Sequence, residues 1–225
     1  MKVLGLDTAT TACSAAVWID GAIVASRRLT MNRGQAEALA PMIMATLEDA
    51  GMAEVRDLDR IAVTIGPGAF TGLRIALATA RGFSVATGLP VAGVTTFDAL
   101  AHAVPARLRA GRILLVAVDS RRAEPFCQLY HADLTPQGEP FALLPDAVAA
   151  RLPAGPLLLA GDGASPLREA LATRADTAFA PGDGLPDAGV VAALGAAMAP
   201  PLPPARPLYL RPPDVTLPKA KAAAP

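Results

Sequence analysis

Residues 61–82, IAVTIGPGAFTGLRIALATARG, constrain the fold more than any other part of the chain. The apolar run Ile61–Ile65 predicts a buried strand, and a helix that extends to about Thr87 follows it. Glycines at 66 and 68 on either side of a proline predict a tight turn between the two elements. Thr71 has the hydroxyl expected of the helix N-cap. A buried strand that turns directly into a long helix is typical of an α/β protein.

Small residues recur along this predicted helix. Gly72, Ala76, Ala80 and Gly82 are spaced by two to four residues, so they lie close together on one side of the helix. Such a side allows another helix to approach very closely. We therefore interpret the segment as a contact surface rather than a site of chemistry.

The first hundred residues predict three strands followed by alternating helices and strands. The strands are expected at Val3–Asp7, Ser14–Ile19 and Ala22–Arg28, with a two-residue hairpin turn at Asp20-Gly21. An amphipathic helix is expected at Gln35–Ala50. After the segment 61–82 come a strand and a short helix, at Val91–Val94 and Phe97–Ala103. This order predicts a sheet covered by helices, the α/β class.

A second unit begins after a linker at 105–111. Strands are expected at Ile113–Asp119, Phe126–Tyr130 and Leu157–Ala160, and an Ala-rich buried helix at Ala188–Ala199. We expect an N-terminal lobe at 1–104, a smaller C-terminal lobe at 105–210 and a Pro-rich mobile tail at 211–225. Tyr209, flanked by Leu208 and Leu210, is expected to anchor part of the Pro-rich stretch that follows Ala199.

Composition excludes several classes of function. Lys and Arg number 20 and Asp and Glu also 20, so no net positive charge favours nucleic acid. No apolar run reaches the length of a membrane span, and no signal peptide is recognised. The two cysteines, Cys13 and Cys127, lack metal or redox spacing. We expect a cytoplasmic protein that does not interact with membranes.

The turn after the first strand is the strongest candidate for ligand chemistry. Asp7, Thr8 and Thr10 offer a carboxylate and hydroxyls that could hold a phosphate or a magnesium-bound water, and Asp119 ends another strand. Asp and Thr are also ordinary turn residues. Both interpretations stay open: a weak site for ATP or ADP with magnesium, or a structural turn.

Five segments together resemble one family of proteins. They are LGLDTATTACSAAVW at 4–18, GPGAFTGLRIALATARG at 66–82, GVTTFDALA at 93–101, AVDSRRAE at 117–124 and PLYLR at 207–211. In order and spacing they are similar to TsaB, also called YeaZ, a partner subunit in the threonylcarbamoyl-adenosine modification of bacterial tRNA. The resemblance implies an actin-like fold, as in sugar kinases and Hsp70 ATPases, with two lobes built on one repeated plan.

The resemblance also implies that this chain is not the catalyst. The related catalytic subunit, TsaD, binds a metal through two histidines, which align with Thr96 and Leu100 here. Neither side chain can replace an imidazole ligand. Ala9 stands where ATP-hydrolysing relatives have glycine. The resemblance therefore implies a noncatalytic subunit without a metal or a cofactor of its own.

The partners implied are TsaD, the ATPase TsaE, and tRNA only through the complex; alone, the chain would form a homodimer. We expect it to dock on TsaD through two helices, by the residues Leu73, Arg74, Ala76, Leu77 and Ala80, with Leu39 and Ile43 beside them. Two other classes stay open: a kinase-like enzyme that uses Asp7 and Asp119 for magnesium-phosphate, and a peptidase. The sequence shows no nucleophile or metal set for the peptidase.

Overall fold

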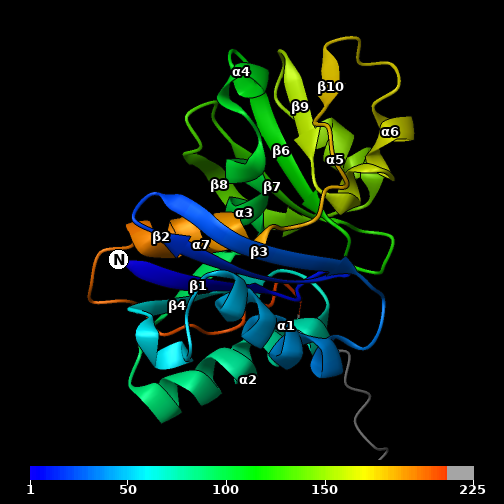
Figure 1. Cartoon of the computed structure of the whole chain (residues 1–225). Helices are drawn as coiled ribbons and strands as arrows, with labels where there is room; N and C mark the ends of the chain where they lie inside the picture. The colour runs from blue at the N-terminus through cyan, green and yellow to red at the C-terminus, as the bar shows by residue number, and fades with distance from the viewer. Residues whose placement is uncertain (212–225) are drawn as a thin grey trace, which may run out of the picture.

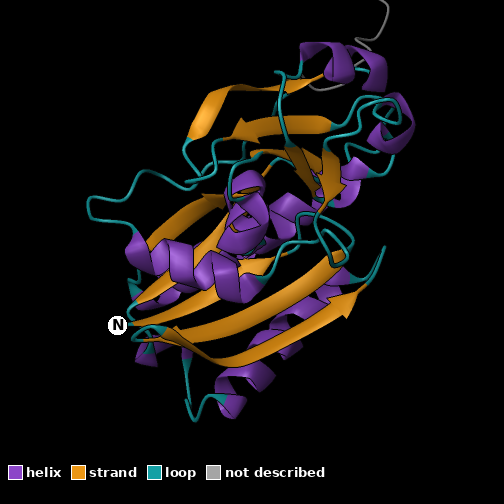
Figure 2. Cartoon of the chain, turned by 90° about the horizontal axis from the view of Figure 1, so that it is seen from above, coloured by secondary structure: helices purple, strands orange, loops and turns teal. Residues whose placement is uncertain are grey.

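The computed structural model describes residues 1–211, so most of the tail expected at 211–225 lies outside the described residues. The chain forms two five-stranded sheets with helices on both faces of each (Figure 1). Figure 2 shows the same arrangement from above, with helices between the two sheets. The predicted α/β class is confirmed.

The first sheet contains β1 (Lys2–Asp7), β2 (Ala12–Ile19), β3 (Ala22–Thr30), β4 (Arg60–Gly66) and β5 (Val91–Thr95). Its strand order is β3-β2-β1-β4-β5. The first three strands pair antiparallel through tight connections, while β4 and β5 run parallel to β1. All five strands were predicted from the sequence to within a few residues at their ends.

The second sheet repeats this plan. It contains β6 (Ile113–Val118), β7 (Phe126–Tyr130), β8 (Pro136–Ala142), β9 (Leu157–Ala160) and β10 (Thr177–Phe179), in the order β10-β9-β6-β7-β8. As in the first sheet, three antiparallel strands come first and two strands parallel to the first one follow. Strand β8 was not predicted because prolines and polar residues interrupt its apolar pattern, and β10 was not predicted because it has only three residues.

The helices form three layers around the sheets. Their bounds are α1 (Gln35–Asp49), α2 (Phe70–Thr87), α3 (Thr96–Ala103), α4 (Ala106–Arg109), α5 (Pro145–Arg151), α6 (Leu167–Ala170) and α7 (Ala188–Ala197), with 3-10 turns at Val55–Asp57 and Asp162–Ala164. Helices α1 and α2 cover the outer face of the first sheet, and α5 and α6 cover that of the second. Helices α3 and α7 lie between the two sheets.

Helix α7 lies directly against the first sheet because two glycines remove the side chains between them. A Cβ atom on Gly5 would collide with the carbonyl oxygen of Ala188, and one on Gly195 with the side chain of Ala62. The lobe expected at 105–210 is therefore not one unit to its end, since α7 returns the chain to the first sheet.

Residues 198–211, which we call the C-terminal strap, continue along the first lobe. The amide of Leu208 donates to the carbonyl of Ile65 at 2.7 Å. As expected, Tyr209 anchors this segment: its ring packs on Phe70 with centroids 5.5 Å apart. Arg211 then pairs with Glu124 of the second lobe at 2.6 Å. The strap therefore contacts the beginning of α2 in the first lobe and Glu124 in the second lobe.

The start of α2 differs from the prediction. The helix begins at Phe70, with Ala69 as its N-cap, so Thr71 lies inside the first turn and caps nothing. The amide of Ala69 instead donates to the carbonyl of Ala9 at 2.7 Å. Backbone contacts with the turn after β1, rather than a capping side chain, position this end of the helix.

Candidate functional site

Six of the seven residues predicted to dock on a partner are buried inside the chain itself. Leu73, Ala76, Leu77, Ala80, Leu39 and Ile43 are each at most 2% exposed. Five of them belong to the core between α1, α2 and the first sheet, and Leu73 is buried near Gly66, so none of these side chains is available to another protein. Only Arg74 of that set is exposed. The spacing predicted a tightly packed helix face correctly, but it could not show that the neighbour was the chain's own sheet.

Gly72 and Gly68 likewise face inward. A Cβ atom on Gly72 would collide with the carbonyl oxygen of Thr8, and one on Gly68 with that of Ala9. The hydroxyl of Thr8 also donates to the carbonyl of Gly72 at 2.6 Å. Because these two glycines have no side chain, the turn after β1 packs directly against the start of α2.

The opposite side of α1 and α2 is exposed and largely apolar. We call it the outer helical face and define it by the residues Ala40, Met44, Ala78, Gly82, Val85 and Ala86, all exposed. Gly82 was expected on the same side as Ala76 and Ala80, but it lies on the exposed side because it follows Ala80 by only two residues. Val85 is 89% exposed, which is unusual for a β-branched apolar side chain in a helix. The same two helices also expose charged side chains, among them Glu48, Arg74 and Arg81, so these apolar residues form only part of the exposed surface. Apolar and small residues that lie together in water are typical of a protein interface.

Asp7, the first residue of the candidate ligand turn, is completely buried at the end of β1. Its Oδ1 accepts from the hydroxyl of Thr64 at 2.7 Å and from the amide of Ala9 at 3.1 Å. Its Oδ2 has no partner among the described residues. Burial raises the pKa of Asp7 to about 6, although both hydrogen bonds act in the opposite direction.

The other candidate ligand residues, Thr8, Thr10 and Asp119, lie in different surroundings. Thr8 is bonded to α2, while the Thr10 hydroxyl is buried without a described partner. Asp119 lies after β6, where its Oδ1 accepts from the amide of Arg121 at 2.8 Å. The negative charge of Asp162, rather than that of Asp119, contributes to the raised pKa of Asp7. The amide of Asp119 donates to Oδ1 of Asp162 at 2.8 Å, so Asp119 is held by a neighbour within the second lobe.

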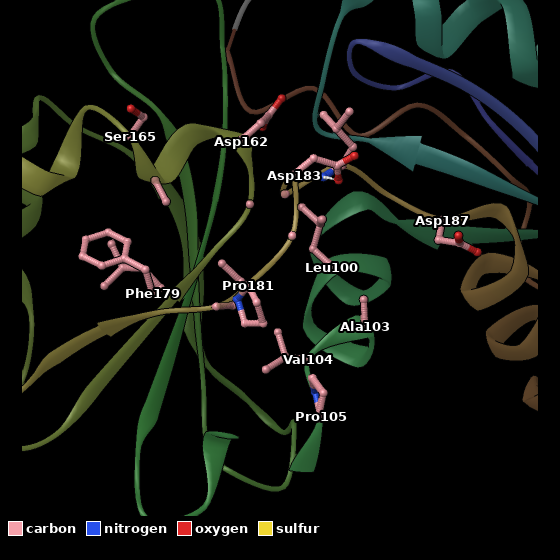
Figure 3. A pocket seen from close by; sticks show the side chains of 18 of the residues that line it. Leu100, Ala103, Val104, Pro105, Asp162, Ser165, Phe179, Pro181, Asp183 and Asp187 are labelled. Atoms are coloured by element: carbon pink, nitrogen blue, oxygen red, sulfur yellow. Dashed lines mark hydrogen bonds between the residues drawn. The ribbon is translucent and has the colours of Figure 1, made fainter. Parts of the chain in front are cut away.

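A cavity of about 360 Å³ lies between the lobes. In Figure 3, Leu100 and Ala103 of α3, with Val104 just after it, form one wall and Phe179 lies opposite. Asp162, Asp183 and Asp187 also line it. Burial raises the pKa of Asp162. Arg28 and Arg168 line it as well, so the lining carries charges of both signs.

Sequence reasoning missed the groups that join the lobes here. Arg28 of β3 pairs with Asp183 at 2.5 Å and lies near Asp7, whereas the sequence favoured a solvated side chain or a bridge to a partner protein. The turn Gly161-Asp162-Gly163 after a buried strand was the available signal for Asp162. Among residues 1–211, no group of three or more His, Cys, Asp or Glu side chains could hold a metal ion. In the same part of the chain, no helix is both long and apolar enough to cross a bilayer.

Comparison with known proteins defines the class. The sequence model of a family described as TsaD, tRNA N6-adenosine threonylcarbamoyltransferase, matches residues 29–142, half of the chain. The crystal structure of YeaZ from Pseudomonas aeruginosa superposes with a TM-score of 0.79 at 29% identity, covering 93% of this chain and 99% of that one. The structure of a PilM-PilN type IV pilus complex shares the fold alone, with a TM-score of 0.50 at 13% identity, over 80% of this chain and 88% of that one.

Curated relatives are similar over shorter stretches. The tRNA threonylcarbamoyladenosine biosynthesis protein TsaB of Escherichia coli is 35% identical over 133 residues, 59% of this chain and 56% of that protein. TsaB of Haemophilus influenzae is 32% identical over 124 residues, 55% of this chain and 51% of that protein. The chain thus spans about half the length of the curated relatives it matches.

The repeated five-stranded sheets, with two helices between them, define a two-lobed protein of the actin-like fold class. Within that class, the chain belongs to the family of the matching sequence model, as a member of its TsaB/YeaZ group.

Proposed function

We propose that this protein is a noncatalytic subunit in the threonylcarbamoylation of tRNA adenosine, and that it binds and activates the catalytic subunit TsaD. The names of its TsaB relatives support the modification, and the match to the TsaD sequence model supports a TsaD-type partner. The observation that carries the docking proposal is the outer helical face, where Val85 is 89% exposed.

This face is suited to a helical partner. Ala78, Gly82 and Ala86 are small, so a helix packed across α2 could approach its backbone closely. Met44 and Val85 add larger apolar contacts at its sides. A specific interface buries about 800 Å² on each partner, an area that two neighbouring helix faces can supply.

The residues between the lobes support a noncatalytic role for this chain. Thr96 and Leu100, which align with the metal-binding histidines of TsaD, are both buried in α3. Asp7 is completely buried, and its Oδ1 already accepts from the hydroxyl of Thr64 in β4 and from the amide of Ala9. These features disfavour the kinase-like alternative. In the same proposal the protein is cytoplasmic, TsaE joins the TsaD-bound assembly, and without TsaD the outer helical face pairs two copies of this chain.

The test of docking is Ala78→Arg in the full chain, measured by calorimetric titration with purified TsaD. An arginine at this exposed position leaves the fold intact but places a long charged side chain in the contact, so we expect affinity to fall at least about tenfold. Ala150→Arg, an exposed alanine on α5 of the other lobe, is the matched control and should bind normally. Equal affinities for the two variants would exclude the outer helical face. Ala76→Arg is unsuitable, because Ala76 is in the core.

A further inference from the structure

A second hollow, of about 620 Å³, lies where the start of β4, the second half of α2 and the C-terminal strap meet. We call it the arginine hollow. Arg60, Arg81 and Arg206 line it together with Ser84, and no Asp or Glu is among its lining residues. Within residues 1–211, none of the three arginines forms an ion pair. Three positive charges around one hollow repel each other and favour an anion between them.

Arg60 is the most buried of the three arginines. It is only 6% exposed, and its Nη1 donates to the carbonyl of Met198 at 2.7 Å and to that of Gly195, at the end of α7. The partial negative charge of that helix end offsets part of the charge of Arg60. Its Nε is buried without a hydrogen-bond partner among the described residues. A buried donor without a partner is costly, so the contacts of Arg60 with the end of α7 leave part of its hydrogen-bonding capacity unused.

Arg81 and Arg206 supply the exposed charge. Arg81 extends from α2 to the strap, where its Nη2 donates to the carbonyl of Ala205 at 2.7 Å. Arg206 is the next residue of the strap. The prolines of this part of the strap, at 200, 203 and 204, have no N–H group. These prolines therefore supply no donors, and the guanidinium groups of Arg81 and Arg206 are the charged donors at the hollow.

We propose that the arginine hollow binds a phosphate group, through Arg81 and Arg206, with Arg60 behind them and the hydroxyl of Ser84 beside them. A guanidinium offers several N–H groups in a planar fork that matches phosphate oxygens. The phosphate belongs either to a free nucleotide or to the backbone of an RNA. This binding does not require the docking proposed above, because Arg81 contacts the strap whereas Ala78 and Val85 belong to the outer helical face.

The test compares the full-length wild-type chain with a double variant, Arg81→Gln and Arg206→Gln. Arg33→Gln with Arg107→Gln is the matched control, since it removes the same charge at two exposed arginines elsewhere. The probes are inorganic phosphate and ADP by calorimetry, and an unmodified tRNA transcript by fluorescence anisotropy, all at low salt. Thermal unfolding of each variant checks that the fold is retained.

We expect the hollow variant to lose at least about tenfold in affinity for one class of probe while the control changes less than about twofold. A loss for phosphate and ADP identifies a nucleotide site, and a loss for tRNA identifies a contact with the RNA backbone. The proposal is overturned if the wild type binds none of the three probes. It is also overturned if the two double variants lose affinity equally, because the effect would then be one of overall charge.

Discussion

Asp7 is a residue that the sequence suggests as a ligand-binding group but that is buried and hydrogen-bonded within the fold. The sequence placed a carboxylate at the end of a strand, which fits either a magnesium-phosphate site or a turn. In the structure Oδ1 of Asp7 accepts hydrogen bonds from Thr64 and Ala9, and burial raises the pKa of Asp7 to about 6. The two hydrogen bonds to Oδ1 support the interpretation as a structural turn. The raised pKa of Asp7 predicts that the stability of the protein depends on pH.

Asp7→Asn tests this dependence. The folded pKa, about 6, lies above the ordinary value of 3.8. The folded state therefore binds the proton more tightly, and this contribution to stability is complete below pH 4 and is lost as the pH rises through 6. At pH 8 the wild type must bury a charged carboxylate that the amide avoids. We expect the variant to be more stable at pH 8, by up to roughly 3 kcal/mol, and the difference to shrink at pH 5.

Denaturant unfolding of both proteins at the two pH values measures this difference. Asp162 raises the pKa of Asp7 and Arg28 lowers it, so both residues stay unchanged in the comparison. A stability difference that is the same at pH 5 and pH 8, or larger at pH 5, would show that Asp7 is not protonated on folding.

At the scale of the element, helix α2 has two faces with separate roles. Its buried face packs on the first sheet, and its glycine at 72 admits the carbonyl of Thr8. Its exposed face carries Ala78, Gly82 and Val85. Sequence spacing identified the helix and its small residues. Spacing alone cannot tell which face is covered by the chain, because both faces carry small or apolar residues at similar intervals.

Two glycines of α2 make this difference measurable. Gly72→Ala places a methyl group against the carbonyl of Thr8, so we expect a loss of about 1–3 kcal/mol in the free energy of unfolding. Gly82→Ala meets nothing within 4 Å, so it should stabilise the helix by about 0.5–1 kcal/mol. Thermal unfolding of the two variants under one condition compares them. Similar stabilities would mean that Gly72 does not serve close packing.

At the scale of the whole molecule, the first sheet was predicted more completely than the second. The strands of the first sheet have continuous apolar patterns, such as Ile61–Ile65. In the second lobe, β8 contains two prolines and a glycine, and β10 has only three residues, so their pairing depends on neighbouring strands and not on local pattern. The resemblance to TsaB supplied the repeated plan, which the two matching strand orders confirm.

Contacts between distant segments were the part that the sequence could not show. Arg28 and Asp183 join the lobes, and the strap brings Tyr209 onto Phe70. Each pair is separated by more than a hundred residues, so no local spacing predicts it. The arginine hollow depends on the same kind of contact, since Arg206 of the strap meets Arg81 of α2 only in the folded chain.

The central claim is that this protein acts in tRNA modification by binding TsaD and not by chemistry of its own. The most direct measurement is the threonylcarbamoylation of a tRNA transcript in a reconstituted system of TsaD, TsaE and the synthetase that supplies the threonylcarbamoyl-adenylate. We predict no sustained modification without this chain, full modification with the wild type or Ala150→Arg, and a failure of Ala78→Arg to restore it. Modification that proceeds equally well without the chain, or that the chain performs in the absence of TsaD, would contradict the account.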